Sequence, residues 1–452
     1  MTEAVDVVVI GMGPGGENVG GLLAEAGLSV LGVDARLLGG ECPYFGCVPS
    51  KMLIRGANAV TEARRVPELA GKSTVEPDFG QVATRIRDEA TDNWDDKGAV
   101  DRFIGKGGTF VRGRARITGP GTVSVNGTEY TARRGIVLNT GSDPLVPSIP
   151  GLADTPFWTN RDALRAERAP ESLCVLGGGP IGVELAQAFS RLGSTVTVIQ
   201  SRPRLLPGDE PEAGDLLAEV FRAEGITVHT GAKARAVRHD ADGFAVEFGA
   251  GDVARAQALL VATGRRTNLA DLGLETIGLD PAARFLDPDE QLRVADGVWA
   301  IGDITGKGAF THMSMYQSAI AVRDILGEPG QRAEYHAVPR VTFTDPEVGS
   351  VGLTEAQARE QGLSVRVGYT PLANSTRGWI HKAGAEGFIK IVEDADRGVL
   401  VGATSVGPTG GETLSYLAVA VHGEVPTKRL AGMIFAYPTF YRAIESALAD
   451  LH

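Results

Sequence analysis

The spacing of hydrophobic positions at the start of the chain predicts a strand, a helix and a second strand. The β-branched run from Val5 to Ile10 is typical of a buried strand, and Asn18 to Ala26 follows a helical spacing. A further apolar run from Ser29 to Val33 ends at Asp34. This order predicts a βαβ motif, the building block of an α/β fold with a parallel sheet.

The same order recurs in the middle of the chain. A strand is predicted from Cys174 to Leu176, a helix from Ile181 to Leu192, and a strand from Thr195 to Ile199. The Pro-rich stretch from Asp143 to Gly151 has the composition of a linker. Two βαβ motifs imply two dinucleotides or one domain inserted into another. The other predicted elements are a polar helical stretch over 79–101, short strands over 111–130, and a last α/β region from 341 onward.

Length, charge and cysteine content narrow the class of protein. The 452 residues are enough for two to four domains. The net charge of −12 argues against binding to nucleic acid or anionic membranes. Three cysteines are too few for a secreted disulfide framework, and the N-terminus lacks the basic region of a signal peptide. Because no apolar run reaches the roughly 18 residues of a membrane span, we expect a cytoplasmic protein.

The first βαβ motif carries the glycine pattern of a dinucleotide-binding loop. Gly11 would permit the turn, Gly13 would let a pyrophosphate approach the backbone, and Gly16 would let helix and strand pack. The phosphates would bind at the N-terminus of the helix. Asp34, which ends the second strand, would accept hydrogen bonds from a ribose diol.

The second βαβ motif repeats the glycine pattern but lacks the acidic residue. Its glycines are Gly177, Gly179 and Gly182. Gln200 stands at the acidic position, with Arg202 and Arg204 close behind. A carboxylate there would repel a 2′-phosphate, whereas arginines bind one. We therefore expect NADPH, and NADH stays the alternative because Gly182 favours it.

The stretch from Gly39 to Lys51 holds two of the three cysteines, Cys42 and Cys47. A helix is predicted to begin near Cys47, because Pro49 suits a first helical turn. In a straight helix the pair would be about 7.5 Å apart along the axis, so a disulfide requires a bend before the helix. So small a loop adds little stability, which favours a redox pair over a structural one. The alternative is two buried free cysteines.

Three more strands are predicted to end in residues suited to a cofactor. The strand over 136–139 is followed by Thr140 and Gly141, and the strand over 258–262 is closed by Gly264. The strand over 298–301 ends in Gly302 and Asp303, where the glycine allows close approach and the carboxylate can bond a polyol. Cofactor-binding candidates at these ends are Thr140, Gly141, Gly264, Gly302 and Asp303.

Six motifs follow one another in a family-specific order. They are GMGPGG, GGECPYFGCVPSK, GGGPIGVE, ATGRRTN, AIGD and FTDPEVGSVGLTE. This order resembles the class I flavoprotein disulfide oxidoreductases, which include dihydrolipoamide dehydrogenase, glutathione reductase and mercuric reductase. The resemblance implies two Rossmann-like dinucleotide-binding domains and a C-terminal α+β dimerisation domain. It places FAD on residues 1–146 and 265–332, NAD(P)H on 147–264, and the contacts of a homodimer on 335–452.

The resemblance also implies roles for single residues. Cys47 would be the thiol next to the flavin, and Cys42 the thiol that exchanges with the substrate. Lys51 would lie near the flavin N5 and pair with Glu184. Asp303 would bind the ribityl chain of FAD. No metal site is expected.

The chain departs from this family near its C-terminus. Thiol-reducing members have a His-Pro-Thr motif and a glutamate five residues after the histidine, which protonates the leaving thiol. Here Tyr437 occupies the histidine position and Arg442 the glutamate position, with Glu445 at a different spacing. A tyrosine, with an ordinary pKa of about 10, is a poor base at neutral pH. Mercuric reductases also carry tyrosine near this point, but their terminal cysteine pair is missing from 449–452.

We therefore expect an oxidoreductase that passes electrons from nicotinamide through FAD and the cysteine pair to a small-molecule acceptor. The acceptor would be one whose reduction does not require protonation by an acid–base residue, such as an activated disulfide, a metal ion or a quinone. One alternative is a C–S bond-cleaving enzyme of the coenzyme M reductase/carboxylase kind, in which phenylalanine replaces the histidine. Another is a non-catalytic flavin-binding redox sensor. The remaining candidate histidines are His312, His381 and His422.

Overall fold

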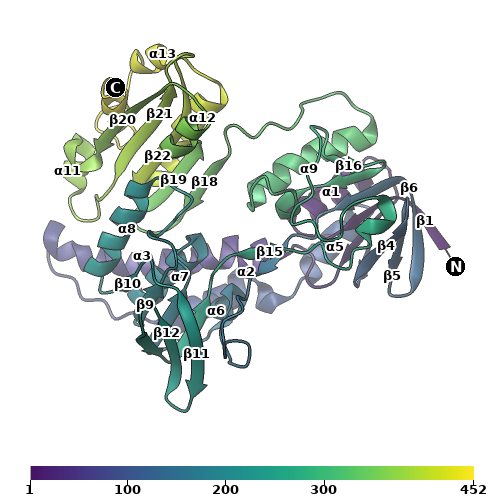
Figure 1. The fold of residues 1–452 in the computed structure, drawn as a ribbon, viewed down its shortest axis with the longest axis horizontal. Helices are drawn as coiled ribbons and strands as arrows, with labels where there is room; N and C mark the ends of the chain where they lie inside the picture. The colour runs from purple at the N-terminus through teal and green to yellow at the C-terminus, as the bar shows by residue number, and fades with distance from the viewer. Residues whose placement is uncertain (1) are drawn as a thin grey trace. The chain divides into compact units, whose positions relative to one another are not determined.

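The computed structural model describes residues 2–452, which divide into two compact units (Figure 1). Unit 1 comprises the chain up to Pro49 together with Ile86–Leu145 and Arg265–Tyr335. Unit 2 comprises Ser50–Arg85, Val146–Gly264 and His336–His452. The mixture of parallel sheets and helices confirms the α/β class predicted from the two βαβ motifs.

Unit 1 is built on an eight-stranded sheet. Its strands follow the order β16-β17-β6-β1-β2-β3, and β4 and β5 extend it from β6 as an antiparallel meander. β1 pairs in parallel with both β2 and β6. The strands are β1 (Thr2–Ile10), β2 (Val30–Asp34), β3 (Thr109–Arg112), β4 (Ala115–Gly119), β5 (Thr122–Val125), β6 (Thr128–Leu138), β16 (Arg293–Ala295) and β17 (Val298–Ala300). A separate two-stranded ribbon pairs β7 (Ser142–Pro144) with β15 (Arg265–Thr267).

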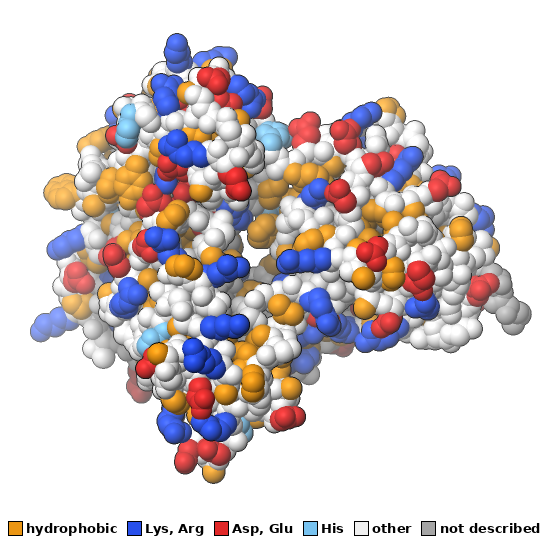
Figure 2. All heavy atoms as spheres, viewed as in Figure 1, with side chains coloured by type: hydrophobic (Ala, Val, Ile, Leu, Met, Phe, Trp, Pro, Cys, Tyr) orange, Lys and Arg blue, Asp and Glu red, His pale blue; other side chains and the backbone are white. Residues whose placement is uncertain are grey.

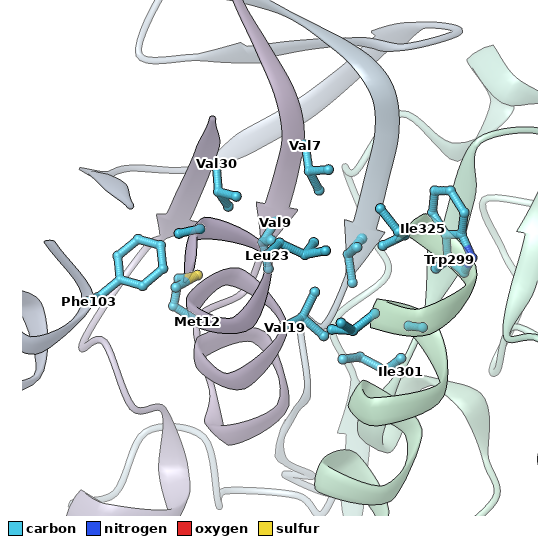
Figure 3. Packing of buried hydrophobic residues seen from close by; sticks show 14 of the residues in the cluster. Val7, Val9, Met12, Val19, Leu23, Val30, Phe103, Trp299, Ile301 and Ile325 are labelled. Atoms are coloured by element: carbon cyan, nitrogen blue, oxygen red, sulfur yellow. The ribbon is translucent and has the colours of Figure 1, made fainter. Parts of the chain in front are cut away.

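Both faces of this sheet are covered. Alternate residues of β1 point to opposite faces. Val7 and Val9 join one buried cluster with residues of helices α1 (Pro14–Glu25) and α9 (Thr311–Leu326), as Figure 3 shows. Val8 and Ile10 join a second cluster on the other face. Such two-sided burial explains why the second half of β1, from Val7 to Ile10, is apolar without alternation. The other helices of unit 1 are α2 (Glu41–Phe45), α5 (Lys97–Gly105) and the short 3₁₀ turns η3 (Leu274–Ile277) and η4 (Gly302–Thr305).

The helix predicted over 79–101 is interrupted. It consists of α4 (Phe79–Arg85), the π-helix η1 (Ile86–Ala90), the turn η2 (Asp92–Trp94) and the start of α5. All three residues of η2 have positive φ, so the chain turns with the opposite hand there. Trp94 Nε1 donates to the carbonyl oxygen of Tyr44, 3.1 Å away, a contact that the local polar pattern does not reveal.

Unit 2 contains three sheets. A parallel sheet has the order β10-β9-β8-β14, a second sheet is β11-β12-β13, and a five-stranded antiparallel sheet has the order β18-β19-β22-β21-β20. The strands are β8 (Ser172–Leu176), β9 (Thr195–Ile199), β10 (Thr227–His229), β11 (Ala234–Asp240), β12 (Gly243–Phe248), β13 (Asp252–Ala256), β14 (Ala258–Val261), β18 (Pro339–Thr342), β19 (Glu347–Gly352), β20 (Val365–Pro371), β21 (Phe388–Asp394) and β22 (Val399–Gly407). The parallel sheet with its crossover helix is the second predicted βαβ motif.

The helices of unit 2 accompany these sheets. They are α6 (Asn160–Arg165), α7 (Pro180–Arg191), α8 (Pro211–Ala223), α10 (Glu355–Glu360), η5 (Leu372–Asn374), α11 (Thr376–His381), α12 (Gly410–His422), α13 (Thr427–Ala431) and α14 (Ala443–Ala449). Helix α3 (Cys47–Leu69) begins in unit 1 and continues in unit 2. Across residues 2–452, none of the helices combines the length and apolar character that a bilayer span requires. Figure 2 shows basic and acidic side chains interspersed on the visible face.

Candidate active site

The two cysteines of the 39–51 stretch lie on consecutive short elements. Helix α3 begins at Cys47, where the sequence predicts a helix start. Cys42 lies in α2, and Gly46 separates the two helices with φ −134° and ψ −113°. This break supplies the bend that a straight helix lacks, so the two thiols hydrogen-bond with each other. All three cysteines of the chain are free thiols in this structure.

The surroundings of the two thiols are not equivalent. The hydrogen bond to Cys47, followed by burial, raises the pKa of the Cys42 thiol well above its ordinary range. Cys47 is the first residue of α3, where the helix dipole favours a thiolate. Its Sγ lies 3.2 Å from Oγ1 of Thr311, the first residue of α9. The raised pKa of Cys42 therefore indicates that this thiol keeps its proton, although a hydrogen bond with Thr311 lowers the same pKa in part.

Thr311, the neighbour of the candidate His312, contacts the thiol pair although the sequence pattern did not indicate it. His312 is exposed and stacks on Phe310, with ring centroids 5.1 Å apart. Thr311 contacts Cys47 across 264 positions of sequence. A hydroxyl on the first residue of α9 is the signal that could have pointed to it.

The first glycine loop has the shape of a phosphate-binding cradle. A Cβ on Gly11, whose φ is +93°, would lie 2.2 Å from the carbonyl oxygen of Asn139. A Cβ on Gly16 would lie 2.0 Å from the carbonyl oxygen of Gly11. At Gly13 the nearest atom to such a Cβ is Asn139 Nδ2, at 3.4 Å. The fold thus requires the first and third glycines, while the second leaves room beside the N-terminus of α1, which suits a diphosphate.

Asp34 is held at the end of β2 by backbone amides. Its Oδ2 accepts from the N–H of Met12 and its Oδ1 from that of Arg36, each at 2.8 Å. Burial nevertheless raises the pKa of the Asp34 carboxyl. Each carboxylate oxygen can accept a second hydrogen bond, so the oriented group suits a ribose diol. These residues fit the adenosine half of FAD.

The other predicted strand ends of unit 1 are tied together by hydrogen bonds. Thr140 Oγ1 donates to the carbonyl oxygen of Asn268 at 2.7 Å, and Asn268 N–H donates to that of Gly141 at 3.0 Å. Gly302, with φ +76°, donates its N–H to the buried Gln317 side chain at 2.7 Å. Asp303 Oδ2 accepts from the hydroxyl of Ser142 at 2.5 Å. The second oxygen of Asp303 is thereby oriented, as binding of a polyol requires.

Lys51 and Glu184 form an ion pair in unit 2. Lys51 Nζ lies 2.8 Å from Glu184 Oε2, and Glu184 is only 6% exposed. The other carboxylate oxygen accepts the N–H of Phe343 at 2.9 Å. The Phe343 ring also faces the ammonium, with 4.6 Å between Nζ and the ring centroid. Phe343 thus holds both members of the pair, a role that its sequence motif does not disclose.

The second glycine loop repeats the geometry of the first. A Cβ on Gly177 would lie 2.2 Å from the carbonyl oxygen of Ala262, and one on Gly182 2.1 Å from that of Gly177. A Cβ on Gly179 would meet nothing within 4 Å. The space at Gly179 lies at the N-terminus of α7, so the loop also suits a dinucleotide diphosphate. Gly264, with φ +136°, lies between β14 and β15.

The residues after β9 differ in their partners. Gln200 is buried and its Nε2 donates to the carbonyl oxygen of Arg204 at 3.3 Å. The Arg204 guanidinium is paired with Asp215, with Nε 2.9 Å from Oδ2. Arg202 is exposed, and no residue of the described chain 2–452 forms an ion pair or hydrogen bond with its side chain. Of the two arginines, Arg202 is therefore the one whose charge is available to a ligand.

Tyr437 contacts residues of the C-terminal part of unit 2. The side chain is 66% exposed, and its hydroxyl lies 3.3 Å from Oγ1 of Thr376. The Arg442 guanidinium faces the Tyr437 ring at 5.5 Å and forms an ion pair with Glu445 at 2.9 Å. Glu445 is therefore engaged by Arg442. The two other candidate histidines pack against rings, His381 on Phe440 and His422 on His336.

Comparison with known proteins gives matches along nearly the full chain. Residues 5–321 match the family model described as pyridine nucleotide-disulphide oxidoreductase, and residues 338–448 match the dimerisation domain of the same family. A dihydrolipoyl dehydrogenase of Thermus scotoductus is 34% identical over 100% of this chain and 98% of the relative. A mercuric reductase of Acidithiobacillus ferrooxidans is 32% identical over 98% of this chain and 82% of the relative. The Cu(II) complex of the HOCl-induced flavoprotein disulfide reductase RclA from Escherichia coli has a TM-score of 0.84 and 26% identity, covering 99% of each chain.

Proposed function

The chain belongs to the class I pyridine nucleotide-disulphide oxidoreductases, and we propose that it carries electrons from NADPH through FAD and the Cys42–Cys47 pair to an acceptor. The family is FAD-dependent and uses a pyridine nucleotide, and its dimerisation domain indicates a homodimer. The observation that carries the proposal is the hydrogen-bonded thiol pair at the start of α3, in the unit whose glycine loop and Asp34 suit FAD. We assign FAD to residues 1–146 and 265–332, NADPH to 147–264, and dimer contacts to 335–452.

In the proposed electron transfer, the two cysteines, Thr311 and Lys51 would each have a separate role. Bound FAD supplies the transfer of two electrons between nicotinamide and the thiols. NADPH would leave as NADP⁺, and its two electrons with one proton would convert the Cys42–Cys47 disulfide into the Cys42 thiol and the Cys47 thiolate. Cys42 retains its proton because its pKa is raised, while the start of α3 and the Thr311 hydroxyl stabilise Cys47 as thiolate. Lys51, fixed by Glu184, would place a positive charge near the flavin N5.

The C-terminal segment supports an acceptor that needs little proton help. Tyr437 stands where thiol-reducing relatives have a histidine, and an exposed tyrosine is a poor acid–base group at neutral pH. We propose an activated disulfide, a metal ion or a quinone as acceptor. A relative named for mercuric ion and a structural neighbour captured with Cu(II) support the metal ion among these.

An anaerobic titration with NADPH tests the thiol pair. We expect a long-wavelength absorption band after two electrons per chain, because a thiolate next to an oxidised flavin gives a charge-transfer transition. Cys47→Ser should abolish the band, whereas Cys174→Ala, in a buried strand of unit 2, should keep it. A wild-type protein that binds FAD and accepts two electrons without this band would contradict the thiol relay.

An acceptor screen tests the role of Tyr437. NADPH oxidation would be followed with lipoamide, glutathione disulfide, quinones, Cu(II) and Hg(II). Tyr437→His should raise the rate with lipoamide, by up to about a hundredfold, because an imidazole can protonate the leaving thiol. Tyr369→His, at another exposed tyrosine of the same domain, is the matched control. If the wild type already reduces lipoamide as fast as the Tyr437→His variant does, the missing histidine does not limit the acceptor.

A further inference from the structure

A line of polar contacts in unit 1 joins the thiol segment, which is α2 and the start of α3 with Cys42 and Cys47, to Asp303. It runs from Glu41 through Arg265 and Ser142 to Asp303. We propose that Arg265 is a positioning residue that holds the cofactor-binding carboxylate and the thiol segment at once. The inference rests on the proposed function, because it takes Asp303 as the group that binds the polyol of FAD.

The contacts of Arg265 fix the direction of the Ser142 hydroxyl. Arg265 Nε donates to Ser142 Oγ at 2.8 Å, and Nη2 donates to the carbonyl oxygen of the same residue at 2.5 Å. Because Ser142 Oγ accepts from the guanidinium, its own proton is left to donate to Asp303 Oδ2 at 2.5 Å. Ser142 is only 6% exposed, so water has little access to this bond. The carboxylate of Asp303 is thereby held in one orientation.

The same guanidinium reaches the thiol segment. Arg265 Nη2 lies 3.6 Å from Glu41 Oε2, and Glu41 is the first residue of α2, directly before Cys42. Arg265 itself is fixed in the ribbon of β7 and β15, where it pairs with Pro144. The planar fork of an arginine can serve several acceptors in fixed directions, which a lysine ammonium does not do. Loss of Arg265 should therefore loosen both ends of the line.

Four variants test the contact with Asp303 and the contact with Glu41 separately. Arg265→Met removes the whole tie, Ser142→Ala removes only the arm to Asp303, and Glu41→Gln removes only the charge on the thiol segment. Arg266→Met is the matched control, since Arg266 is the exposed neighbour of Arg265 on β15. Thermal unfolding followed by circular dichroism would show which variants fold. If Arg265→Met does not fold, Ser142→Ala and Glu41→Gln still test the inference.

The first readout is the rate at which FAD leaves the diluted holoenzyme, followed by the rise in flavin fluorescence. We expect Arg265→Met and Ser142→Ala to release FAD roughly tenfold faster, the effect of losing a hydrogen bond to a charged group. Glu41→Gln and Arg266→Met should match the wild type. Release from Arg265→Met at the wild-type rate would overturn the inference.

The second readout is alkylation of Cys42 by iodoacetamide in the reduced holoenzyme, measured on peptides by mass spectrometry. Arg265→Met and Glu41→Gln should react severalfold faster than the wild type, because Glu41, directly before the half-buried Cys42, is no longer tied to Arg265. The double variant should react no faster than the faster single variant if both act through one tie. Additive effects would overturn the coupling. A wild-type protein that holds no FAD would instead count against the proposed function.

Discussion

At the scale of single residues, the chemistry of the thiol pair depends on neighbours that come from distant parts of the chain. Cys42 and Cys47 are only five positions apart in the sequence, but the hydroxyl beside Cys47 belongs to Thr311. In the same way, the Glu184 carboxylate accepts hydrogen bonds from the Lys51 ammonium and from the backbone N–H of Phe343. These partners form the surroundings of the Cys47 thiol and orient the Lys51 ammonium.

Thr311→Val should make the Cys47 thiolate less stable, because the valine cannot donate a hydrogen bond. Hydrogen bonds to charged groups contribute about 1.5–3 kcal/mol, so the titration of the thiolate should move up by about one to two pH units. The pH dependence of the long-wavelength band in the two-electron-reduced enzyme measures this shift. Thr311→Ser keeps the hydroxyl and serves as control, and a valine variant with the wild-type titration would exclude a role for Thr311.

Arg202→Ala should weaken NADPH binding while leaving NADH binding unchanged, because only the 2′-phosphate would meet the guanidinium. A charge-assisted hydrogen bond of about 1.5–3 kcal/mol corresponds to a rise in KM for NADPH of roughly tenfold or more. Arg204→Ala should have a smaller effect, since Asp215 already neutralises Arg204. Equal changes in KM for the two nucleotides would show that the loop does not select the phosphate.

At the scale of elements, the first strand of each βαβ motif is joined to its helix by a loop with three glycines. At the first and third of these positions, only glycine fits. Gly177 and Gly182 touch backbone atoms of the loop and of the neighbouring strand end, whereas Gly179 faces open space. The three glycines of the loop before α7 are therefore needed for two different reasons. Gly177 and Gly182 are required by the fold, and Gly179 leaves the space that the proposed dinucleotide would use.

Gly182→Ala and Gly179→Ala should separate these constraints. A methyl group at Gly182 would lie 2.1 Å from the Gly177 carbonyl oxygen, so we expect a loss of about 1–3 kcal/mol in the free energy of unfolding. A methyl group at Gly179 has room in the protein but would occupy the place that we propose for the diphosphate. Gly179→Ala should keep the wild-type Tm and raise KM for NADPH, as thermal melts and steady-state kinetics would show. A destabilised Gly179→Ala with normal KM would contradict the assignment.

At the scale of the whole molecule, exposed apolar side chains concentrate in the region that matches the dimerisation domain. Val419 is 69% exposed, Ile434 95% and Trp379 76%. Figure 2 shows hydrophobic side chains gathered on the surface over α11. Exposed apolar residues of this size are typical of a surface that another chain covers.

Val419→Asp and Ile434→Asp should each weaken the homodimer, because a carboxylate would be buried without a partner at the interface. Size-exclusion chromatography with light scattering would show a larger monomer fraction at low protein concentration. Ile104→Asp, at a 52% exposed position of α5 in unit 1, is the control and should leave the dimer intact. Dimers as stable as the wild type in both variants would place the interface elsewhere.

The sequence by itself determined the features that follow from local rules. The βαβ order, the two glycine loops, the helix start at Cys47 and the spacing of the two thiols depend on residues within about one element of each other, where periodicity and backbone freedom decide the outcome. The prediction over 79–101 was only partly right, because the turn at Asp92–Trp94 is held by a contact with Tyr44.

Only the tertiary structure decided which side chains meet across the chain. The contacts of Thr311 with Cys47, of Ser142 with both Asp303 and Arg265, and of Phe343 with Lys51 each join positions more than a hundred residues apart. No local pattern encodes such pairs, since they depend on strand order and on the register with which strand ends reach one edge of a sheet. The thiol pair could therefore be located from sequence, while the groups that contact Cys47 and those that orient Asp303 could not.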